Sequence, residues 1–387
     1  KEVDGLKAMG VWYDDEAVEY DDVVANAKAN NMKVNFARGF AIASLKHSES
    51  EGEAVNKGRF VLGGDRLTDA HGQAATFEAA GAAPSTTAAT RMAIAYGSAP
   101  NHVCWVSDAP KAYVQSVIPP DAIPTYMELP KWLFPASWSV FRRPCVLLHR
   151  PLYGHPLSGD VWHEFASKHL ISLGFVESEV FASVYFRAAD GVMVNLYVDD
   201  FMFSGPQAAV QSAFDSLSKL IHLEAPADID RYLGCHYRRQ WINNEDGVKV
   251  CHVSFDMTEF AQSCVTQYLD VAGDVLKQHT SSTTAHDKAK TEARRLLNLP
   301  YAPTPFIEDV DTDNDEEEGG MLSSIALSVI MKIMYMARVA RPDLLRAVTG
   351  LSSAVTRWRP HHDRCLRRLV AYIQTTKDMV MTATIGD

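Results

Sequence analysis

Short apolar runs separated by turn residues dominate the middle of the chain, and they predict antiparallel hairpins. The stretch "VFASVYFRAADGVMVNLYVDDFMFSG" contains three apolar runs, with turns predicted at Ala188–Gly191 and at Asp199–Asp200. A second hairpin is predicted around Asn243–Gly247, inside "RYLGCHYRRQWINNEDGVKVCHVSF". Upstream, His102 to Val106 forms another apolar strand that ends at Asp108.

Helical spacing of apolar residues appears between and after these strands. The predicted helices cover 88–96, 162–173, 206–220, most of 256–298, and 321–340. The last of these contains serines, a lysine and an arginine, so it is expected to be a buried or half-buried helix and not a membrane span. Helices that alternate with antiparallel hairpins predict an α+β fold.

Charge is unevenly distributed along the 387 residues, whose net charge is −11. The run "EDVDTDNDEEE" (308–318) holds eight acidic residues, so the rest of the chain carries only −3. Such runs are typical of solvated linkers, and a near-neutral remainder leaves room for local basic patches. One candidate patch is "RWRPHHDRCLRR" (357–368), with five arginines and two histidines.

The six cysteines include no pair at C-x-x-C spacing, which argues against a zinc ribbon or knuckle. Cysteines of this kind are typical of small core side chains in a reducing compartment.

Asp199 and Asp200 stand out because apolar residues flank them on both sides. Burying two adjacent carboxylates is costly, so the pair is expected at a hairpin tip. One interpretation is simply a polar turn, since Asp tolerates turn conformations. The other is a site for Mg²⁺, which prefers oxygen ligands and is commonly held by carboxylates together with substrate phosphates. Two-ion phosphoryl transfer would require a further carboxylate, and Asp108 at a strand end is the candidate.

Several motifs together resemble one family, the reverse transcriptases of copia-type (Pseudoviridae-like) LTR retrotransposon polyproteins. "YVDD" in an apolar hairpin follows an upstream D-x-x-x-A-Y that begins at Asp108. Five further stretches resemble the family's motifs in the same order: "KGRFVLGG", "TYMELP", "RPLYGHPLSGDVWHEFASKHLISLGF", "RYLGCHYRR" and "IMYMARVARPDLLRAVTGLSS". The agreement in order extends over most of the chain and therefore carries more weight than any single motif.

The resemblance implies a right-hand polymerase with palm, fingers and thumb. It places fingers in 1–100, and palm in 101–230 with a fingers insertion at about 118–155. The thumb would be 231–300, followed by an acidic linker (301–320) and by a connection segment (321–387) that leads to a truncated ribonuclease H region. The implied activity is RNA-directed DNA synthesis, with deoxynucleoside triphosphates, an RNA or DNA template–primer, and two Mg²⁺ or Mn²⁺ ions.

The resemblance also assigns roles to residues. Asp108, Asp199 and Asp200 would be catalytic and would bind the metal ions, with the carbonyl of Ala109 as an extra ligand. Nucleotide contacts would come from the basic side chains of two residues, from the backbone of two and from one aromatic side chain that excludes a 2′-hydroxyl: Lys57, Arg59, Lys111, Ala112 and Tyr113. Primer contacts would come from Tyr197, Val198, Leu233 and Gly234.

Three positions depart from the family pattern. Leu157 replaces the family's glutamine, Asp160 replaces its arginine, and Pro110 removes a backbone donor. These changes motivate a second hypothesis, a decayed retroelement copy that binds nucleic acid without polymerising. Two further hypotheses are a non-catalytic interaction protein and an unrelated metal-dependent phosphotransferase. The resemblance implies no membrane partner, and it implies cytoplasmic virus-like particles or the nucleus as the location.

Overall fold

The computed structural model describes the chain except for residues 47–54, 78–82, 281–286, 307–318 and 387. It divides into two compact units, Lys1–Asp228 and Ile229–Asp387. Three sheets and eleven α-helices occur in the described residues, so the predicted α+β class is confirmed. The assignment of fingers, palm and thumb remains a prediction.

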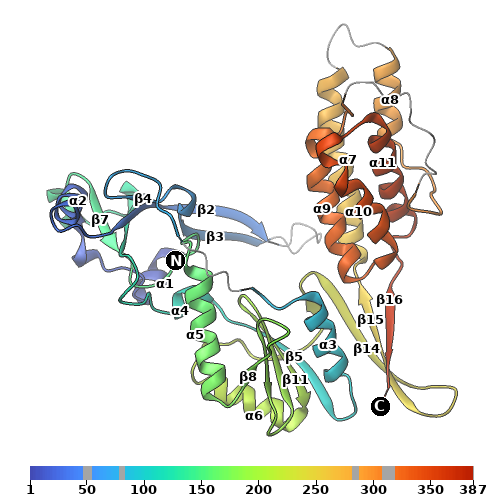
Figure 1. Ribbon diagram of the computed structural model, residues 1–387, viewed down its shortest axis with the longest axis horizontal. Helices are drawn as coiled ribbons and strands as arrows, with labels where there is room; N and C mark the ends of the chain where they lie inside the picture. Colours follow the sequence, from blue (N-terminus) through green and yellow to red (C-terminus); the bar gives the residue numbers. More distant parts are fainter. Residues whose placement is uncertain (47–54, 78–82, 281–286, 307–318, 387) are drawn as a thin grey trace. The chain divides into compact units, whose positions relative to one another are not determined.

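The first unit contains two sheets (Figure 1). Its N-terminal sheet has the strand order β1-β7-β6-β2-β3, with β4 paired to β2. The strands are β1 (Val18–Glu19), β2 (Asn35–Lys46), β3 (Val55–Leu62), β4 (Thr68–Asp69), β6 (Thr125–Glu128) and β7 (Pro144–Leu147). Helix α1 (Glu2–Ala8) contacts strand β3 of this sheet, and helix α2 (Tyr20–Ala29) contacts strand β1. Leu6 of α1 belongs to the same buried cluster as Phe60 and Leu62 of β3.

The second sheet of this unit has the order β12-β5-β11-β10-β9-β8. Its strands are β5 (His102–Asp108), β8 (Val176–Glu177), β9 (Val184–Arg187), β10 (Val192–Tyr197), β11 (Asp200–Pro206) and β12 (Ala227–Asp228). The helices around it are α3 (Thr87–Gly97), α4 (Ala112–Gln115), α5 (Ser158–Ser172) and α6 (Gln207–Leu217).

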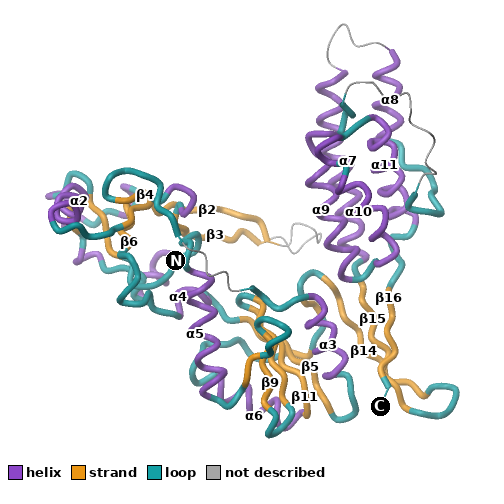
Figure 2. The backbone as a smooth tube through the Cα atoms, in the orientation of Figure 1, coloured by secondary structure: helices purple, strands orange, loops and turns teal. Residues whose placement is uncertain are grey.

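Alternation along the strands separates the two faces of this second sheet. Phe201 and Phe203 of β11 join α5 and α6 in one buried cluster. The other face is covered by α3 (Figure 2), whose small residues allow a close approach. A Cβ atom on Gly97 would lie only 2.7 Å from the Cβ of Cys104 on β5. Strand β11 is therefore buried on both faces over residues 201–205, and Asp200 is its first, partly exposed residue.

The second unit combines a four-stranded sheet with a helical bundle. The sheet has the order β13-β14-β15-β16, with β13 (Arg231–Tyr232), β14 (Cys235–Asn243), β15 (Lys249–Asp256) and β16 (Met381–Ile385). The helices are α7 (Thr258–Thr280), α8 (Asp287–Leu297), α9 (Ser323–Val339), α10 (Leu345–Ser353) and α11 (Pro360–Thr375). Strand β16, from the end of the chain, pairs with β15 (Figure 1).

Most predicted elements are present with shifted ends. The helix predicted from 162 begins earlier, at Ser158, and the apolar helix predicted over 321–340 is α9, with one face buried. Both predicted hairpin turns outside the Asp pair are confirmed, at Ala188–Gly191 and at Asn243–Gly247. The acidic run 308–318 falls outside the described residues. Within the described part of the chain, no helix is both long enough and apolar enough to cross a bilayer.

All six cysteines lie in the described part of the chain and none forms a disulfide. Five are buried, as expected for core residues, and Cys365 is partly exposed.

Candidate active site

Two of the predicted carboxylates lie opposite each other at the end of the second sheet. Strands β5 and β11 are antiparallel neighbours, and their register pairs Asp108 with Asp200. Side chains of directly paired residues project from the same face of a sheet. Phe201 and Phe203, which follow Asp200 along β11, are fully buried. The burial of this strand fixes its register, and the register then places the two carboxylates together.

The hairpin turn differs from the prediction by one residue. Its two central residues are Val198 and Asp199, whereas Asp200 already pairs with Tyr197 as the first residue of β11. Val198 has a left-handed backbone conformation with φ = 58°, which is rare for a β-branched residue. A turn centred on Asp199–Asp200 is therefore wrong, and the sheet register is the physical reason.

Two hydrogen bonds hold the strained tip in place. The indole N–H of Trp162 on α5 donates to the carbonyl of Val198 at 2.6 Å. The N–H of Ala109 donates to the carbonyl of Asp199 at 2.8 Å. The second bond joins the residue after Asp108 to the hairpin tip, so all three aspartates lie within one hydrogen-bonded backbone arrangement. Strain that the surrounding structure enforces in this way is typical of functional sites.

Aromatic rings connect the carboxylates with a predicted nucleotide-binding residue. The rings of Tyr113 and Tyr153 are 5.2 Å apart, and the guanidinium of Arg59 lies 5.9 Å from the centre of the Tyr153 ring. Burial raises the pKa of Tyr113, and the negative charge of Asp199 raises it further. The same two causes, in the same order, raise the pKa of Tyr153 to about 12. Both phenols are therefore neutral at physiological pH, and both feel the charge of Asp199.

The other three predicted nucleotide contacts, Lys111, Ala112 and Lys57, show no such link to the aspartates in the described part of the structure. Lys111 precedes α4 in a left-handed conformation, and its ammonium lies 3.8 Å from the carboxylate of Glu2 on α1. Ala112 is buried as the first residue of α4. The backbone of Lys57 belongs to β3, but its side chain lies outside the described part of the structure. Tyr113 and Arg59 are therefore the predicted nucleotide contacts that the structure links to the carboxylates by ring contact or charge.

A small cavity of about 160 Å³ lies beside the hairpin tip. It is bounded by Tyr113, Trp162 and Val198, and by His163, whose Nε2 is 3.0 Å from the hydroxyl of Ser183. That hydroxyl donates to the carbonyl of Ala83 at 2.7 Å, so the imidazole Nε2–H is the donor to Ser183. The polar side-chain groups of its lining are the imidazole of His163, the indole N–H of Trp162 and the hydroxyls of Ser183 and Tyr113.

Two of the three departures from the pattern that the resemblance implies lie at the start of α5. Leu157 is the residue before the helix and is half-buried. Asp160 lies in the first turn, where the helix dipole stabilises a carboxylate. The N–H of Leu157 donates to Nδ1 of His155 at 3.2 Å. The Nε2–H of that imidazole must then donate to the hydroxyl oxygen of Thr125, at 3.1 Å.

Burial lowers the pKa of His155 to about 4, from an ordinary value of 6.5. The unfolded chain therefore takes up a proton between pH 6.5 and 4 that the folded chain refuses. Stability from this residue is complete above pH 6.5 and falls as the pH drops toward 4, by up to about 3 kcal/mol. Urea unfolding across this window should show a steeper loss for the wild type than for His155→Gln. Replacement of the exposed His71 by Gln should leave the pH dependence unchanged; a wild-type slope in His155→Gln would refute the assignment.

The aspartates at the hairpin offer oxygen donors of the kind that a divalent cation requires. Among the described residues, no group of three or more His, Cys, Asp and Glu side chains is arranged to hold a metal ion. Mg²⁺ is commonly bound by one or two carboxylates and completed by substrate phosphates, so it does not need such a cage. The facing pair Asp108 and Asp200 supplies two hard oxygen donors, and the adjacent tip presents Asp199. The residues therefore fit an ion that arrives with a phosphate ligand.

Leu233 and Gly234, predicted to contact the primer, belong to the second unit. They form the turn between β13 and β14, with φ angles of 48° and 76°. The hydroxyl of Tyr335 on α9 donates to the carbonyl of Leu233 and ties this turn to the bundle. Only glycine takes such a conformation at no cost, and a Cβ on Gly234 would meet no atom within 4 Å.

Tyr153 and Trp162 were not among the predicted site residues. Both stand in "RPLYGHPLSGDVW", a stretch whose sequence indicated a family motif but no role for either ring. An aromatic residue in a shared motif could have signalled a role, but their partners, Tyr113 and Val198, are 40 and 36 positions away, respectively. Both contacts depend on tertiary packing, which brings the segment before α5 beside Tyr113 and α5 itself beside the hairpin.

Comparison with known proteins gives a distant relationship. No family model matches the chain. Over 242 residues the chain is 20% identical to a protein of Saccharomyces cerevisiae named "Putative transposon Ty5-1 protein". The alignment covers 62% of this chain and 68% of the yeast protein. This similarity supports a retrotransposon-related origin for the chain.

Proposed function

We propose that the chain is an RNA-directed DNA polymerase of a copia-type retroelement. The observation that carries the proposal is the pairing of Asp108 with Asp200 on adjacent strands, beside the hairpin tip that presents Asp199. The similarity to a retrotransposon protein supports a retroelement origin. The proposed activity rests on the geometry of the three aspartates. In this proposal the second sheet is the palm, the N-terminal sheet belongs to the fingers, and the second unit contains the thumb.

Asp108, Asp199 and Asp200 would hold two divalent ions, which neutralise phosphate charge and activate the primer 3′-hydroxyl. The chain's own residues would position the reactants. Arg59 would neutralise the triphosphate, with Lys57 as a second cation on the same strand. Further nucleotide contacts would come from the backbone of Lys111 and Ala112, and a further metal ligand from the carbonyl of Ala109.

The contacting rings of Tyr113 and Tyr153, tilted by 58° to each other, would form one wall of the nucleotide site. Tyr113 would also close the space that a ribose 2′-hydroxyl needs. Tyr197 and Val198 would lie under the primer terminus, and Leu233 and Gly234 would hold the primer backbone.

The test of this proposal is extension of oligo(dT) on poly(rA) by the purified chain. We expect incorporation of deoxythymidine triphosphate with Mg²⁺ or Mn²⁺ and none after chelation of the divalent ion. Circular dichroism and a cooperative unfolding transition establish that the protein is folded. A folded chain that extends no primer with either ion would contradict the proposal.

Replacement of Tyr113 by Ala should relax the selection of the sugar. Because the aromatic ring is expected to block a 2′-hydroxyl sterically, incorporation of ribonucleotides relative to deoxynucleotides should rise by about tenfold or more. The matched control is Tyr153→Phe, which keeps the ring that packs against Tyr113 and should leave the ratio unchanged. Competition between the two nucleotides in primer extension measures the ratio, and an unaltered ratio in Tyr113→Ala would remove this role.

A decayed copy that binds nucleic acid without polymerising is the second candidate. Leu157 favours it, since a half-buried alkyl side chain at the start of α5 cannot supply the hydrogen bonds of the family's glutamine. Pro110 favours it as well, because it lacks a backbone donor. This candidate predicts binding of template–primer together with no extension in the same preparation.

A further inference from the structure

The connection between α10 and α11 in the second unit forms a cavity of about 410 Å³. The short 3₁₀ helix η6 (Val355–Arg357) and the start of α11 contribute two arginines and two histidines to its lining: Arg357, Arg359, His361 and His362. The end of α10 contributes only small residues, among them Ser353. This site is separate from the aspartates, which belong to the first unit.

Among the described residues, no carboxylate lines this cavity. The nearest acidic residue along the chain, Asp363, is 2% exposed. Its oxygens accept hydrogen bonds from the indole of Trp358 at 2.7 Å and from the backbone N–H groups of Met321 and Leu322, at 2.7 and 3.1 Å. The charge of Asp363 is thereby used within the fold and does not contribute to the lining of the cavity.

The donors of the cavity are suited to an anion. Arg357 is exposed, and its side chain makes no hydrogen bond or ion pair with a described residue. The N–H of Arg359 donates to Nδ1 of His362 at 3.0 Å, so a neutral imidazole carries its proton on Nε2. Two guanidinium groups and an imidazole N–H are therefore grouped in one concave site, a donor set typical of phosphate recognition.

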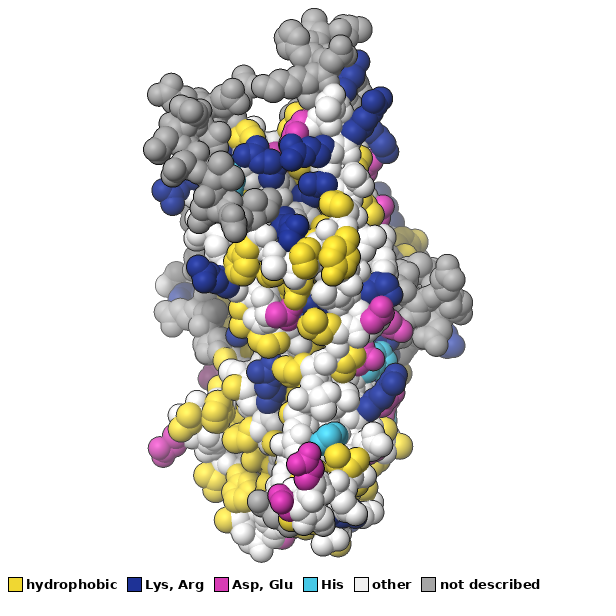
Figure 3. Space-filling view, turned by 90° about the vertical axis from the view of Figure 1, so that its right-hand side faces the viewer, with side chains coloured by type: hydrophobic (Ala, Val, Ile, Leu, Met, Phe, Trp, Pro, Cys, Tyr) yellow, Lys and Arg dark blue, Asp and Glu magenta, His cyan; other side chains and the backbone are white. Residues whose placement is uncertain are grey.

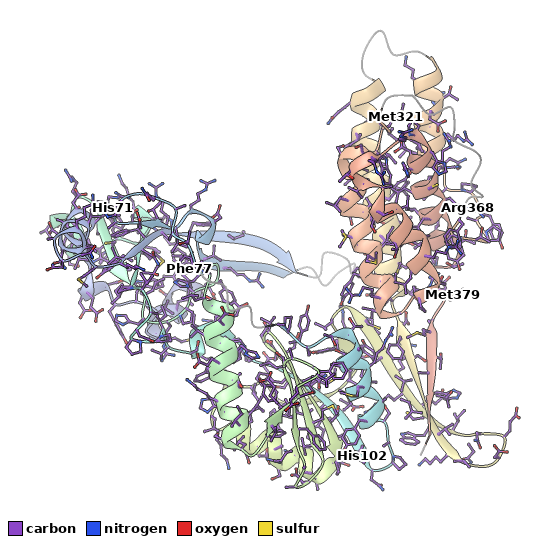
Figure 4. The ribbon with its side chains drawn as sticks, in the orientation of Figure 1. His71, Phe77, His102, Met321, Arg368 and Met379 are labelled. Atoms are coloured by element: carbon purple, nitrogen blue, oxygen red, sulfur yellow. The ribbon has the colours of Figure 1, made fainter. Side chains whose placement is uncertain are left out.

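Basic side chains continue along the same helix beyond the cavity. Arg367 and Arg368 lie on α11 and Arg295 on α8. The pKa of Arg367 is lowered by burial and then by the positive charge of Arg295, with a smaller effect of Arg368. Figure 3 shows Lys and Arg side chains gathered in the upper part of the face that it draws, and Figure 4 shows Arg368 on the helical bundle. Glu292 lies 3.7 Å from Arg295 and offsets part of this positive charge, and a polyanion would neutralise more of it.

We propose that this cavity, which we call the α10–α11 cavity, binds a phosphate group in the backbone of a nucleic acid strand. A strand fits better than a free phosphate because the basic side chains extend past the cavity, whereas one phosphate would occupy the cavity alone. The choice of nucleic acid as the partner rests on the proposed function. The contact itself does not require polymerisation.

Binding of a labelled RNA–DNA duplex to the full chain tests this proposal by fluorescence anisotropy at several salt concentrations. Arg357→Gln should weaken binding by roughly threefold to tenfold and lower the slope of log affinity against log salt by about one. Arg357→Gln combined with Arg359→Gln should lower both the affinity and the slope further. Arg357→Lys, which keeps the charge, should retain most of the wild-type affinity. Because the Arg357 side chain makes no hydrogen bond or ion pair with a described residue, its replacement should leave the unfolding transition unchanged.

The matched control is Lys277→Gln, which removes one charge from α7 of the same unit, where Asp274 lies 3.3 Å from the ammonium. It should bind the duplex like the parent. Duplex affinity and salt slope in both arginine variants equal to those of Lys277→Gln would overturn the proposal. So would a loss of calorimetrically measured inorganic phosphate binding with duplex binding intact, since that result identifies a free-phosphate site.

All variants are also measured in an Asp199→Asn background. If the polymerase proposal fails but the arginine variants still lose duplex affinity there, the α10–α11 cavity stands as a nucleic-acid contact. The two proposals can therefore fail independently.

Discussion

Replacing Asp199 with Asn is expected to slow primer extension by about a thousandfold or more, equivalent to about 4 kcal/mol of lost transition-state stabilisation. The substitution removes one negative charge with almost no change in shape. The fold at the tip should survive, because the backbone carbonyl of Asp199 accepts the hydrogen bond from Ala109 and is unchanged by the substitution. Single-nucleotide incorporation by stopped-time gel assay measures the effect.

The control for this variant is Asp215→Asn on the surface of α6, which changes the same charge in the same unit. Its hydrogen bond from Gln211 is exposed and contributes little to stability. Asp215→Asn should extend primers at the wild-type rate. Wild-type extension by Asp199→Asn would show that the polymerase, if present, does not use this hairpin.

Replacing Gly154 with Ala should destabilise the first unit by about 4 kcal/mol, an effect reserved for residues in strained and crowded positions. Gly154 has φ = 91°, and a Cβ there would lie 2.1 Å from the carbonyl oxygen of Leu62. The neighbouring backbone cannot yield easily, since the N–H of Leu62 donates to the carbonyl of Tyr153 at 2.7 Å. The same contact positions the Tyr153 ring against Tyr113, so activity should fall with stability.

The variant Gly72→Ala serves as a control that separates the cost of backbone strain from the cost of a steric clash. Gly72 has a similar φ of 76°, but a Cβ there would meet no atom within 4 Å. Only the left-handed conformation is penalised, at about 1 to 2 kcal/mol. Urea unfolding measures the free energy of unfolding of the two variants. Equal destabilisation would show that the backbones at Leu62 and Gly154 are not tightly packed against each other.

The strands and helices of the second sheet of the first unit could be predicted because their apolar periodicity is strong. Asp108 and Asp200 were predicted to converge, and their pairing across β5 and β11 agrees with that expectation. The turn was misplaced by one residue because local propensity favours Asp over Val in a turn. The register of β10 against β11 overrides that propensity, and the hydrogen bond from Trp162 to the Val198 carbonyl, which no local pattern encodes, supports it.

Contacts between residues far apart in the sequence were the feature least predictable from the sequence. The backbone of Lys111 was expected near a triphosphate, which stays a prediction; its ammonium lies beside Glu2 of α1, a pairing that no local pattern encodes because Glu2 comes from the start of the chain. The place of Arg59 beside Tyr153 depends on how the edge of β3 meets the segment after β7. The pairing of β16 with β15 joins residues more than a hundred positions apart, beyond the reach of any local signal.

The central claim is that Asp108, Asp199 and Asp200 form a divalent-ion site for nucleotidyl transfer. The most direct measurement is the amount of Mn²⁺ bound, by electron paramagnetic resonance, in a complex with a dideoxy-terminated primer–template and the matching deoxynucleotide. The account predicts that the wild-type complex retains Mn²⁺ in excess of the nucleotide and nucleic acid alone, and that Asp108→Asn combined with Asp199→Asn loses this excess. Equal Mn²⁺ binding by the folded wild type and the double variant would contradict it.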